Sequence, residues 1–237
     1  MKKWLRRVRD NFITRIGNEL RRQLPKRNLG SFDLIEMGWF NAAMESARYY
    51  GDHMQAAECF SDDESLREFS VRRRNIQGLV LEFGVASGRT INQIARAVFP
   101  EPVFGFDSFN GLPEDWNADH RRGKFAQAVP SVQPNVELIV GLFAKTLPQF
   151  LKERSDQQVS LLHIDCDLYS STKVIFEELS SRIVPGTVII FDEYFNYPGW
   201  QQHEFKAFQE FVFSRSLKYS YIGFNRSHAQ VTVVIDG

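Results

Sequence analysis

The chain has 237 residues, of which 43% are hydrophobic and 14% aromatic, and its 29 basic residues balance 29 acidic ones. This is enough apolar sequence for one domain core with an appendage, and a net charge of zero argues against a nucleic-acid-binding protein with a global basic field. No apolar run reaches the roughly 18 residues of a membrane-spanning helix, and two cysteines predict no disulfide framework. The charged N-terminus argues against a secretory signal, so we expect a cytoplasmic protein.

Residues 1–27 form a basic segment, with ten Lys and Arg against Asp10 and Glu19. Apolar residues recur in it every four positions, which predicts one amphipathic helix with a single apolar stripe: Trp4, Val8, Phe12, Ile16, Leu20 and Leu24. Three interpretations stay open. The helix packs on its own domain or on a second copy in a homodimer, it rests as a peripheral helix on the inner membrane face, or it is a solvated arm.

Residues 28–77 are expected to form an N-terminal helical cap. Met37, Phe40 and Met44 are spaced for one helix face, and a second helix follows the Ser-Asp-Asp-Glu start at 61–64. The position of this segment ahead of the main domain suggests that it covers the active site.

From residue 78 to 237 the pattern changes to strands that alternate with helices. We expect strands at 79–83, 103–106, 136–140, 159–164 and 187–191, helices at 88–98, 146–153, 170–183 and 203–214, and a closing antiparallel pair at 219–224 and 230–235. The strand runs are almost continuously apolar, as in sheets that are buried on both faces. This order predicts an α/β domain with a Rossmann-like, mostly parallel sheet, its last strand antiparallel, and helices on both faces.

The first strand of this domain runs into a glycine turn, Glu-Phe-Gly-Val-Ala-Ser-Gly at 82–88. Ligands of open parallel sheets bind beyond the carboxyl ends of the strands. A dinucleotide turn would read Gly-x-Gly-x-x-Gly, and Glu82 would repel a pyrophosphate, which leaves an NAD-dependent dehydrogenase as a distant alternative. The turn favours a cofactor with a positive centre and no phosphates, such as S-adenosylmethionine.

The second strand ends at Asp107, which is placed to accept hydrogen bonds from two ribose hydroxyls. The residues expected to bind the cofactor are Glu82, Gly84, Val85, Ala86, Ser87, Gly88, Thr90, Asp107, Ser108 and Asp165. The alternative is a purely structural turn, in which Glu82 caps a helix and Asp107 is a loop acid.

The domain resembles class I S-adenosylmethionine-dependent methyltransferases of the macrocin O-methyltransferase family. The resemblance spans about residues 78–236, and its most specific stretch is His-Ile-Asp-Cys-Asp-Leu-Tyr-Ser-Ser-Thr at 163–172. It implies methyl transfer to a hydroxyl, often on a sugar of a glycosylated natural product, with a divalent metal that is usually magnesium. It places the metal-binding acids on Asp165, Asp192 and Glu193 and the general base on Asp167. The family commonly has two aspartates at the second pair, so Glu193 departs from its pattern.

The residues themselves support this chemistry. A hydroxyl is a poor nucleophile, and a bound metal with a nearby carboxylate activates it. Asp165 and Asp167 are expected on one face of their strand because they are two residues apart, whereas Cys166 points to the other face and belongs in the core. An all-oxygen set of acids suits Mg²⁺. The alternative is that these aspartates cap the next helix and that the pair at 192–193 is solvated.

Four further residues are candidates for contacts with the acceptor: His163, Tyr194, Trp200 and His203. His163 either orients a ligand or is a core histidine. The aromatic loop at 194–200 either stacks on a sugar or plugs the start of the following helix.

Three functions therefore compete. The first is a magnesium-dependent O-methyltransferase for a sugar or another hydroxylated small molecule. The second is a metal-independent methyltransferase for another acceptor, and the third is a non-catalytic cofactor-binding scaffold of a polysaccharide pathway. Sensitivity to EDTA separates the first two, and acids at every expected strand end argue against the third.

Overall fold

The computed structural model describes residues 27–28 and 31–237. The predicted helix of residues 1–27 therefore lies outside the described residues, apart from Arg27. The short strands β1 (Arg27–Asn28) and β2 (Ser31–Phe32) pair antiparallel, where the sequence predicted only a linker. None of the described helices is long and apolar enough to cross a membrane.

One eight-stranded sheet forms the centre of the domain, in the order β3-β9-β10-β8-β7-β4-β5-β6. Its parallel and antiparallel pairings confirm the predicted sheet, because β10 alone runs antiparallel to both of its neighbours. The strands are β3 (Glu58–Phe60), β4 (Leu79–Phe83), β5 (Val103–Asp107), β6 (Val136–Val140), β7 (Val159–Ile164), β8 (Val188–Phe191), β9 (Tyr219–Asn225) and β10 (Val231–Ile235).

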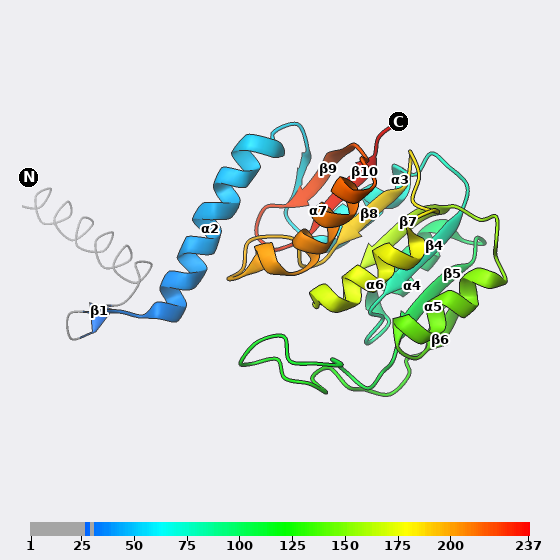
Figure 1. Ribbon diagram of the computed structural model, residues 1–237, viewed down its shortest axis with the longest axis horizontal. Helices are drawn as coiled ribbons and strands as arrows, with labels where there is room; N and C mark the ends of the chain where they lie inside the picture. The colour runs from blue at the N-terminus through cyan, green and yellow to red at the C-terminus, as the bar shows by residue number, and fades with distance from the viewer. Residues whose placement is uncertain (1–26, 29–30) are drawn as a thin grey trace, which may run out of the picture.

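Helices cover both faces of the sheet and bury two separate apolar clusters (Figure 1). On one face lie α5 (Phe143–Lys152), α6 (Tyr169–Leu179) and α7 (Glu204–Ser214), and on the other lie α3 (Asp63–Arg72) and α4 (Arg89–Val98). β4, β7 and β8 are buried along their whole length, because helices pack on both of their faces. Their carboxyl ends meet at one edge of the sheet.

The prediction for residues 28–77 was incomplete. Two helices are present, α2 (Leu34–His53) and α3, but β3 lies between them and pairs parallel with β9. A strand of three residues that is specified only by its distant partner leaves no local periodicity to detect. The other differences are shifts at helix ends: α5 begins at Phe143 rather than 146, and α6 ends at Leu179 rather than 183.

Helix α2 contacts the loop that follows β8. Ser46 Oγ accepts a hydrogen bond from Asn196 N at 2.8 Å, and the Tyr49 hydroxyl lies 2.5 Å from that of Tyr221. The N-terminal half of α2 projects from the domain and leaves Leu34 and Ile35 largely exposed (Figure 1). The helix is therefore anchored at its C-terminal half.

Candidate active site

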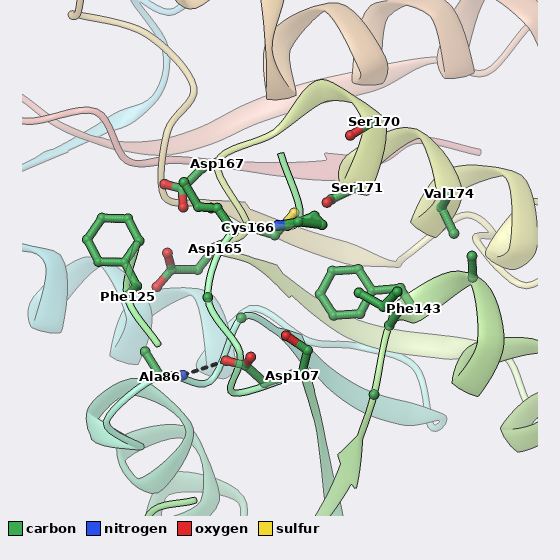
Figure 2. A pocket seen from close by; sticks show the side chains of 18 of the residues that line it. Ala86, Asp107, Phe125, Phe143, Asp165, Cys166, Asp167, Ser170, Ser171 and Val174 are labelled. Carbon is green, nitrogen blue, oxygen red and sulfur yellow. Dashed lines mark hydrogen bonds between the residues drawn. The ribbon is translucent and has the colours of Figure 1, made fainter. Parts of the chain in front are cut away.

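A cavity of about 470 Å³ opens at the carboxyl ends of the central strands, where the sequence predicted a ligand site. Its lining residues all lie between Gly84 and Glu193 in the sequence, so the predicted cap at 28–77 adds none of them. Seven predicted site residues line it: Gly84, Ala86, Asp107, Ser108, Asp165, Asp167 and Glu193. Figure 2 shows Asp107 and Ala86 at one part of the cavity and Asp165 and Asp167 at another.

Asp107, the last residue of the neighbouring strand β5, stabilises the glycine turn through hydrogen bonds. Its Oδ2 accepts hydrogen bonds from Val85 N and Ala86 N, both at 2.9 Å, and its Oδ1 accepts one from Phe109 N at 2.8 Å. Figure 2 shows the bond from Ala86. Each carboxylate oxygen has two lone pairs, so Oδ1 keeps one free for a ligand in the cavity. The side chain thus orders the turn, a role that the sequence did not indicate.

Gly84 is required by the strand beside it. Its φ is +90°, and a Cβ atom added there would lie 1.6 Å from the carbonyl oxygen of Asp165. The glycine therefore lets the turn approach the end of β7 closely, and its backbone also lines the cavity. Gly88, with a φ of +79°, is the N-cap of α4.

Glu82 lies beneath the turn and does not line the cavity. Its side chain is fully buried, with Oε1 accepting a hydrogen bond from Thr90 Oγ1 at 2.8 Å and Oε2 lying 3.0 Å from His163 Nδ1. Val85 is buried in the core and Ser87 is exposed, and neither side chain reaches the cavity. Direct cofactor contact by Glu82, Val85, Ser87, Gly88 and Thr90 stays a prediction.

Two of the predicted metal ligands, Asp165 and Asp192, converge with His163 at the ends of β7 and β8. Among the described residues, a ring nitrogen of His163 and one carboxylate oxygen each of Asp165 and Asp192 lie within 4.8 Å of one another. Glu193, which the resemblance paired with the two aspartates, is not in this group. Glu193 instead lines the cavity with Asp165 and Asp167.

The prediction that Asp165 and Asp167 share one face assumed that the strand continues through Asp167, but it does not. β7 ends at Ile164, and Asp167 has a φ of +62°, in the left-handed region. A non-glycine residue in this conformation is strained, and such strain gathers at functional sites. The turned backbone still brings the carboxylate into the cavity beside Asp165 (Figure 2).

Five acidic side chains lie close together at these strand ends, and the pKa values of Asp165, Asp167, Glu193 and Glu204 are raised. Burial, followed by the charge of Asp192, raises the pKa of Asp167 to about 7. Burial and the neighbouring carboxylates also raise the pKa values of Asp165, Glu193 and Glu204 well above their usual range. The mutual repulsion of such carboxylates is relieved when some of them are protonated or when a cation binds among them.

Glu204, the first residue of α7, is a site residue that the sequence did not reveal. It is fully buried, and its Oε2 accepts a hydrogen bond from Glu193 N at 3.1 Å while Oε1 accepts one from Cys166 N at 3.5 Å. One side chain thus bridges the two acidic strand ends. Acids are common in the first turn of any helix, so its position gave no signal.

Cys166 is buried as predicted, with its sulfur 3.4 Å from Thr172 Oγ1. Burial, with a contribution from Glu204, raises the pKa of its thiol well above the usual value. The thiol therefore stays protonated at neutral pH.

The aromatic loop after β8 is mostly core. Tyr194 and Trp200 are 0% and 1% exposed, so their rings present no face to a sugar and fill the start of α7 instead. His203 is half-buried and lies 5.9 Å from the ring of Trp116 and 6.1 Å from that of Tyr197. Of the aromatic candidates for acceptor binding, His203 is the accessible one.

The chain is similar to known proteins in part of its sequence and in its fold. Residues 81–194 match the family described as a methyltransferase domain, which is just under half of the chain. Within this stretch the chain is similar to a methyltransferase domain. The match runs from β4, which leads into the glycine turn, to the acids after β8. It therefore includes every residue that lines the cavity. No curated protein matches the chain.

Solved structures share the fold. The calicheamicin methyltransferase CalS11 matches with a TM-score of 0.60 and 23% identity, over 73% of this chain and 78% of that one. An apo structure of CalS11, a TDP-rhamnose 3'-O-methyltransferase, gives a TM-score of 0.55 at 22% identity over 73% and 78%. The O-methyltransferase NovP gives 0.55 at 22% over 73% and 79%. At these identities the similarity establishes the fold.

Proposed function

We propose that the protein is an S-adenosylmethionine-dependent O-methyltransferase of the macrocin type, which methylates a hydroxyl of a sugar or glycosylated small molecule with the help of a divalent cation. The observation that carries the proposal is the single cavity that joins the glycine turn, Asp107 and the carboxylates of Asp165 and Asp167. A cofactor and a hydroxyl must meet in one enclosed space for methyl transfer to occur, because the reaction needs an in-line approach.

The cavity fits the cofactor in size and in polarity. Its volume of about 470 Å³ lies in the range of small-molecule sites, and its walls combine apolar side chains such as Leu142 and Phe143 with a few polar groups. The backbone at Gly84 and Ala86, together with Asp107 and Ser108, would hold the nucleoside. The carboxylate of Asp165 would face the positive sulfonium end.

Asp167 is the proposed general base. Its pKa of about 7 makes the carboxylate basic enough to accept a hydroxyl proton and still ionised at slightly alkaline pH. A bound divalent cation would supply Lewis-acid stabilisation of the developing alkoxide. Asp165 and Asp192, whose oxygens converge, fit such a cation, and Glu204 would hold the two acidic strand ends in register.

The crowding of acids also favours this function over the alternatives. A metal-independent methyltransferase or a cofactor-binding scaffold has no need of several buried carboxylates in one place, where their mutual repulsion raises their pKa values. Such a cluster destabilises the fold unless a ligand or the reaction uses it.

The test is a transfer assay with methyl-labelled S-adenosylmethionine and a panel of nucleotide sugars and glycosides, in the presence of Mg²⁺ or Mn²⁺ and again in EDTA. Labelled methyl ether formed only with a divalent cation supports the proposal. Equal transfer in EDTA would favour the metal-independent alternative, and cofactor binding without transfer to any hydroxyl acceptor would favour the scaffold.

We also propose that residues 1–27 attach the protein to a second copy or to the inner membrane face. The support is the excess of Lys and Arg in this segment and the exposed apolar side chains of Leu34, Ile35 and Phe40 directly after it. Sedimentation of the full chain with anionic vesicles, compared with that of a chain starting at Asn28, distinguishes membrane attachment from attachment to a second copy. Equal pelleting of both chains would remove the membrane contact.

A further inference from the structure

His163 is fully buried, yet only one of its two ring nitrogens has a hydrogen-bond partner. Nδ1 lies 3.0 Å from Glu82 Oε2, whereas Nε2 has no partner among the described residues. A buried polar atom without a partner costs about 1–3 kcal/mol, so native proteins rarely contain one without a reason.

The unpartnered nitrogen belongs to a ring beside two carboxylates. A ring nitrogen of His163 and one oxygen each of Asp165 and Asp192 lie within 4.8 Å of one another. Glu82 belongs to β4 on one side of β7, whereas Asp192 follows β8 on the other side. Because Nδ1 is turned to Glu82, Nε2 is the nitrogen that remains for the two aspartates.

We propose that His163 Nε2, with Asp165 and Asp192, binds the divalent cation of this site, and that the site selects a first-row transition ion such as Mn²⁺ over Mg²⁺. The inference rests on the cation-assisted reaction proposed above and replaces the all-acid ligand set expected from the sequence. The third ligand is an imidazole, and Glu193 is left to line the cavity.

The surroundings of His163 are those of a metal-bound histidine. Metal-binding histidines usually donate their other ring N–H to a carboxylate, which fixes the tautomer and makes the ligating nitrogen more basic. Glu82 Oε2 accepts from Nδ1 in this way, and its Oε1 is held by Thr90 Oγ1 at 2.8 Å. This chain of bonds also explains why a carboxylate is buried beneath the turn.

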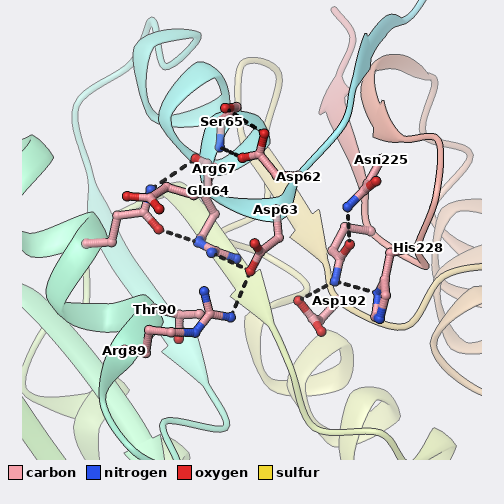
Figure 3. A network of polar contacts seen from close by, with 12 residues as sticks. Asp62, Asp63, Glu64, Ser65, Arg67, Arg89, Thr90, Asp192, Asn225 and His228 are labelled. Carbon is pink, nitrogen blue, oxygen red and sulfur yellow. Dashed lines mark hydrogen bonds and ion pairs between the residues drawn. The ribbon is translucent and has the colours of Figure 1, made fainter.

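The second aspartate is oriented as well. Gln230 Nε2 donates to Asp192 Oδ1 at 3.2 Å and lies 2.9 Å from His228 Nδ1 (Figure 3). Among residues 27–28 and 31–237, no hydrogen bond to Asp192 Oδ2 is present, so this oxygen is available to a cation. Each of the three proposed ligands therefore keeps at least one atom free.

The ligand chemistry determines the preferred ion. Mg²⁺ prefers oxygen ligands in near-ideal octahedral geometry, whereas one imidazole with two carboxylates suits divalent transition ions, which bind nitrogen more strongly. Three protein ligands leave further positions for water and for the hydroxyl of an acceptor.

The experiment uses the full chain and MnCl₂. Free Mn²⁺ is measured by electron paramagnetic resonance, with Mg²⁺ as a competitor, and electron spin-echo envelope modulation of the bound ion detects a directly coordinated nitrogen. The variant is His163→Gln, whose amide can still donate to Glu82. The matched control is His53→Gln, which removes an exposed histidine of α2 outside the site.

We expect the wild type and His53→Gln to show nitrogen modulation and to prefer Mn²⁺. His163→Gln should lose the modulation and bind Mn²⁺ about tenfold or more weakly, with little change for Mg²⁺. Bound Mn²⁺ without nitrogen modulation in the wild type would overturn the inference. This result does not depend on whether any variant folds. It would leave the proposed methyl transfer intact, because transfer and its EDTA sensitivity are measured separately.

Discussion

Glu204 Oε2 accepts a hydrogen bond from the backbone N–H of Glu193 at 3.1 Å. The other oxygen of the same carboxylate accepts from Cys166 N at 3.5 Å, between the two aspartates of the β7 end. The first residue of α7 thus sets the spacing between the acids after β7 and those after β8. The geometry of a cation site at this edge depends on it.

Replacing Glu204 with Gln should therefore weaken cation binding. The amide offers one acceptor oxygen, and its NH₂ group meets the second backbone N–H, so one acidic strand end is released. We expect the affinity for Mn²⁺ or Mg²⁺ to fall about 10–100-fold, as for other residues that position ligands. Glu210→Gln on the same helix is the control, since its carboxylate is exposed and accepts from Tyr169. Unchanged cation affinity in Glu204→Gln would remove the positioning role.

Asp167→Asn tests the general base. Asparagine tolerates a φ of +62° and has nearly the same shape, so the fold should persist while the proton acceptor is lost. We expect turnover to drop about 10²–10⁴-fold with S-adenosylmethionine affinity unchanged, measured by label transfer and calorimetry. A variant that binds the cofactor and keeps near-normal turnover would show that another group takes the proton.

The acid cluster should make stability depend on pH and on cations. The folded pKa of Asp167, about 7, lies above its unfolded value of about 3.9. The folded state therefore holds a proton that the unfolded chain has released, and the free energy of unfolding decreases as the pH rises from 4 to 7. In EDTA the melting temperature should be lower at pH 8 than at pH 6, and a divalent cation should raise it more at pH 8. An equal cation effect at both values would contradict this.

Gly84→Ala should strongly destabilise the protein. The new Cβ would collide with the Asp165 carbonyl, and the φ of +90° adds strain, so we expect a loss of about 3 kcal/mol or more in urea unfolding. Gly123→Ala is the matched control, because Gly123 has a φ of +83° with open space around it. Gly123→Ala should lose only the free energy that comes from the strain of a positive φ, about 1–2 kcal/mol. Similar losses in both variants would mean that β4 and β7 can separate freely.

The sequence predicted the sheet domain well because each element there has a strong local pattern. β4, β7 and β8 are mostly apolar runs, and the glycine turn and the acids mark where they end. Short β3 was missed, since only its pairing with β9 specifies it.

The site was predicted in part for the same reason. Asp107 ends β5, and Asp165 and Asp167 lie within three residues of the end of β7, so the sequence indicated that they would meet. The contact between Glu82 and His163 depends on the register of β4 against β7, which places these two residues opposite each other. Glu204 enters from a helix 11 residues after Glu193, and no spacing rule connects the two.

Calorimetric titration of S-adenosylmethionine into the full chain tests the central claim most directly. It should be run with a divalent cation and with EDTA, on the wild type, on Asp107→Ala and on Asp119→Ala as an exposed acid of the same loop. The account predicts saturable binding by the wild type and by Asp119→Ala, and its loss in Asp107→Ala. No binding by the wild type in either buffer would contradict it.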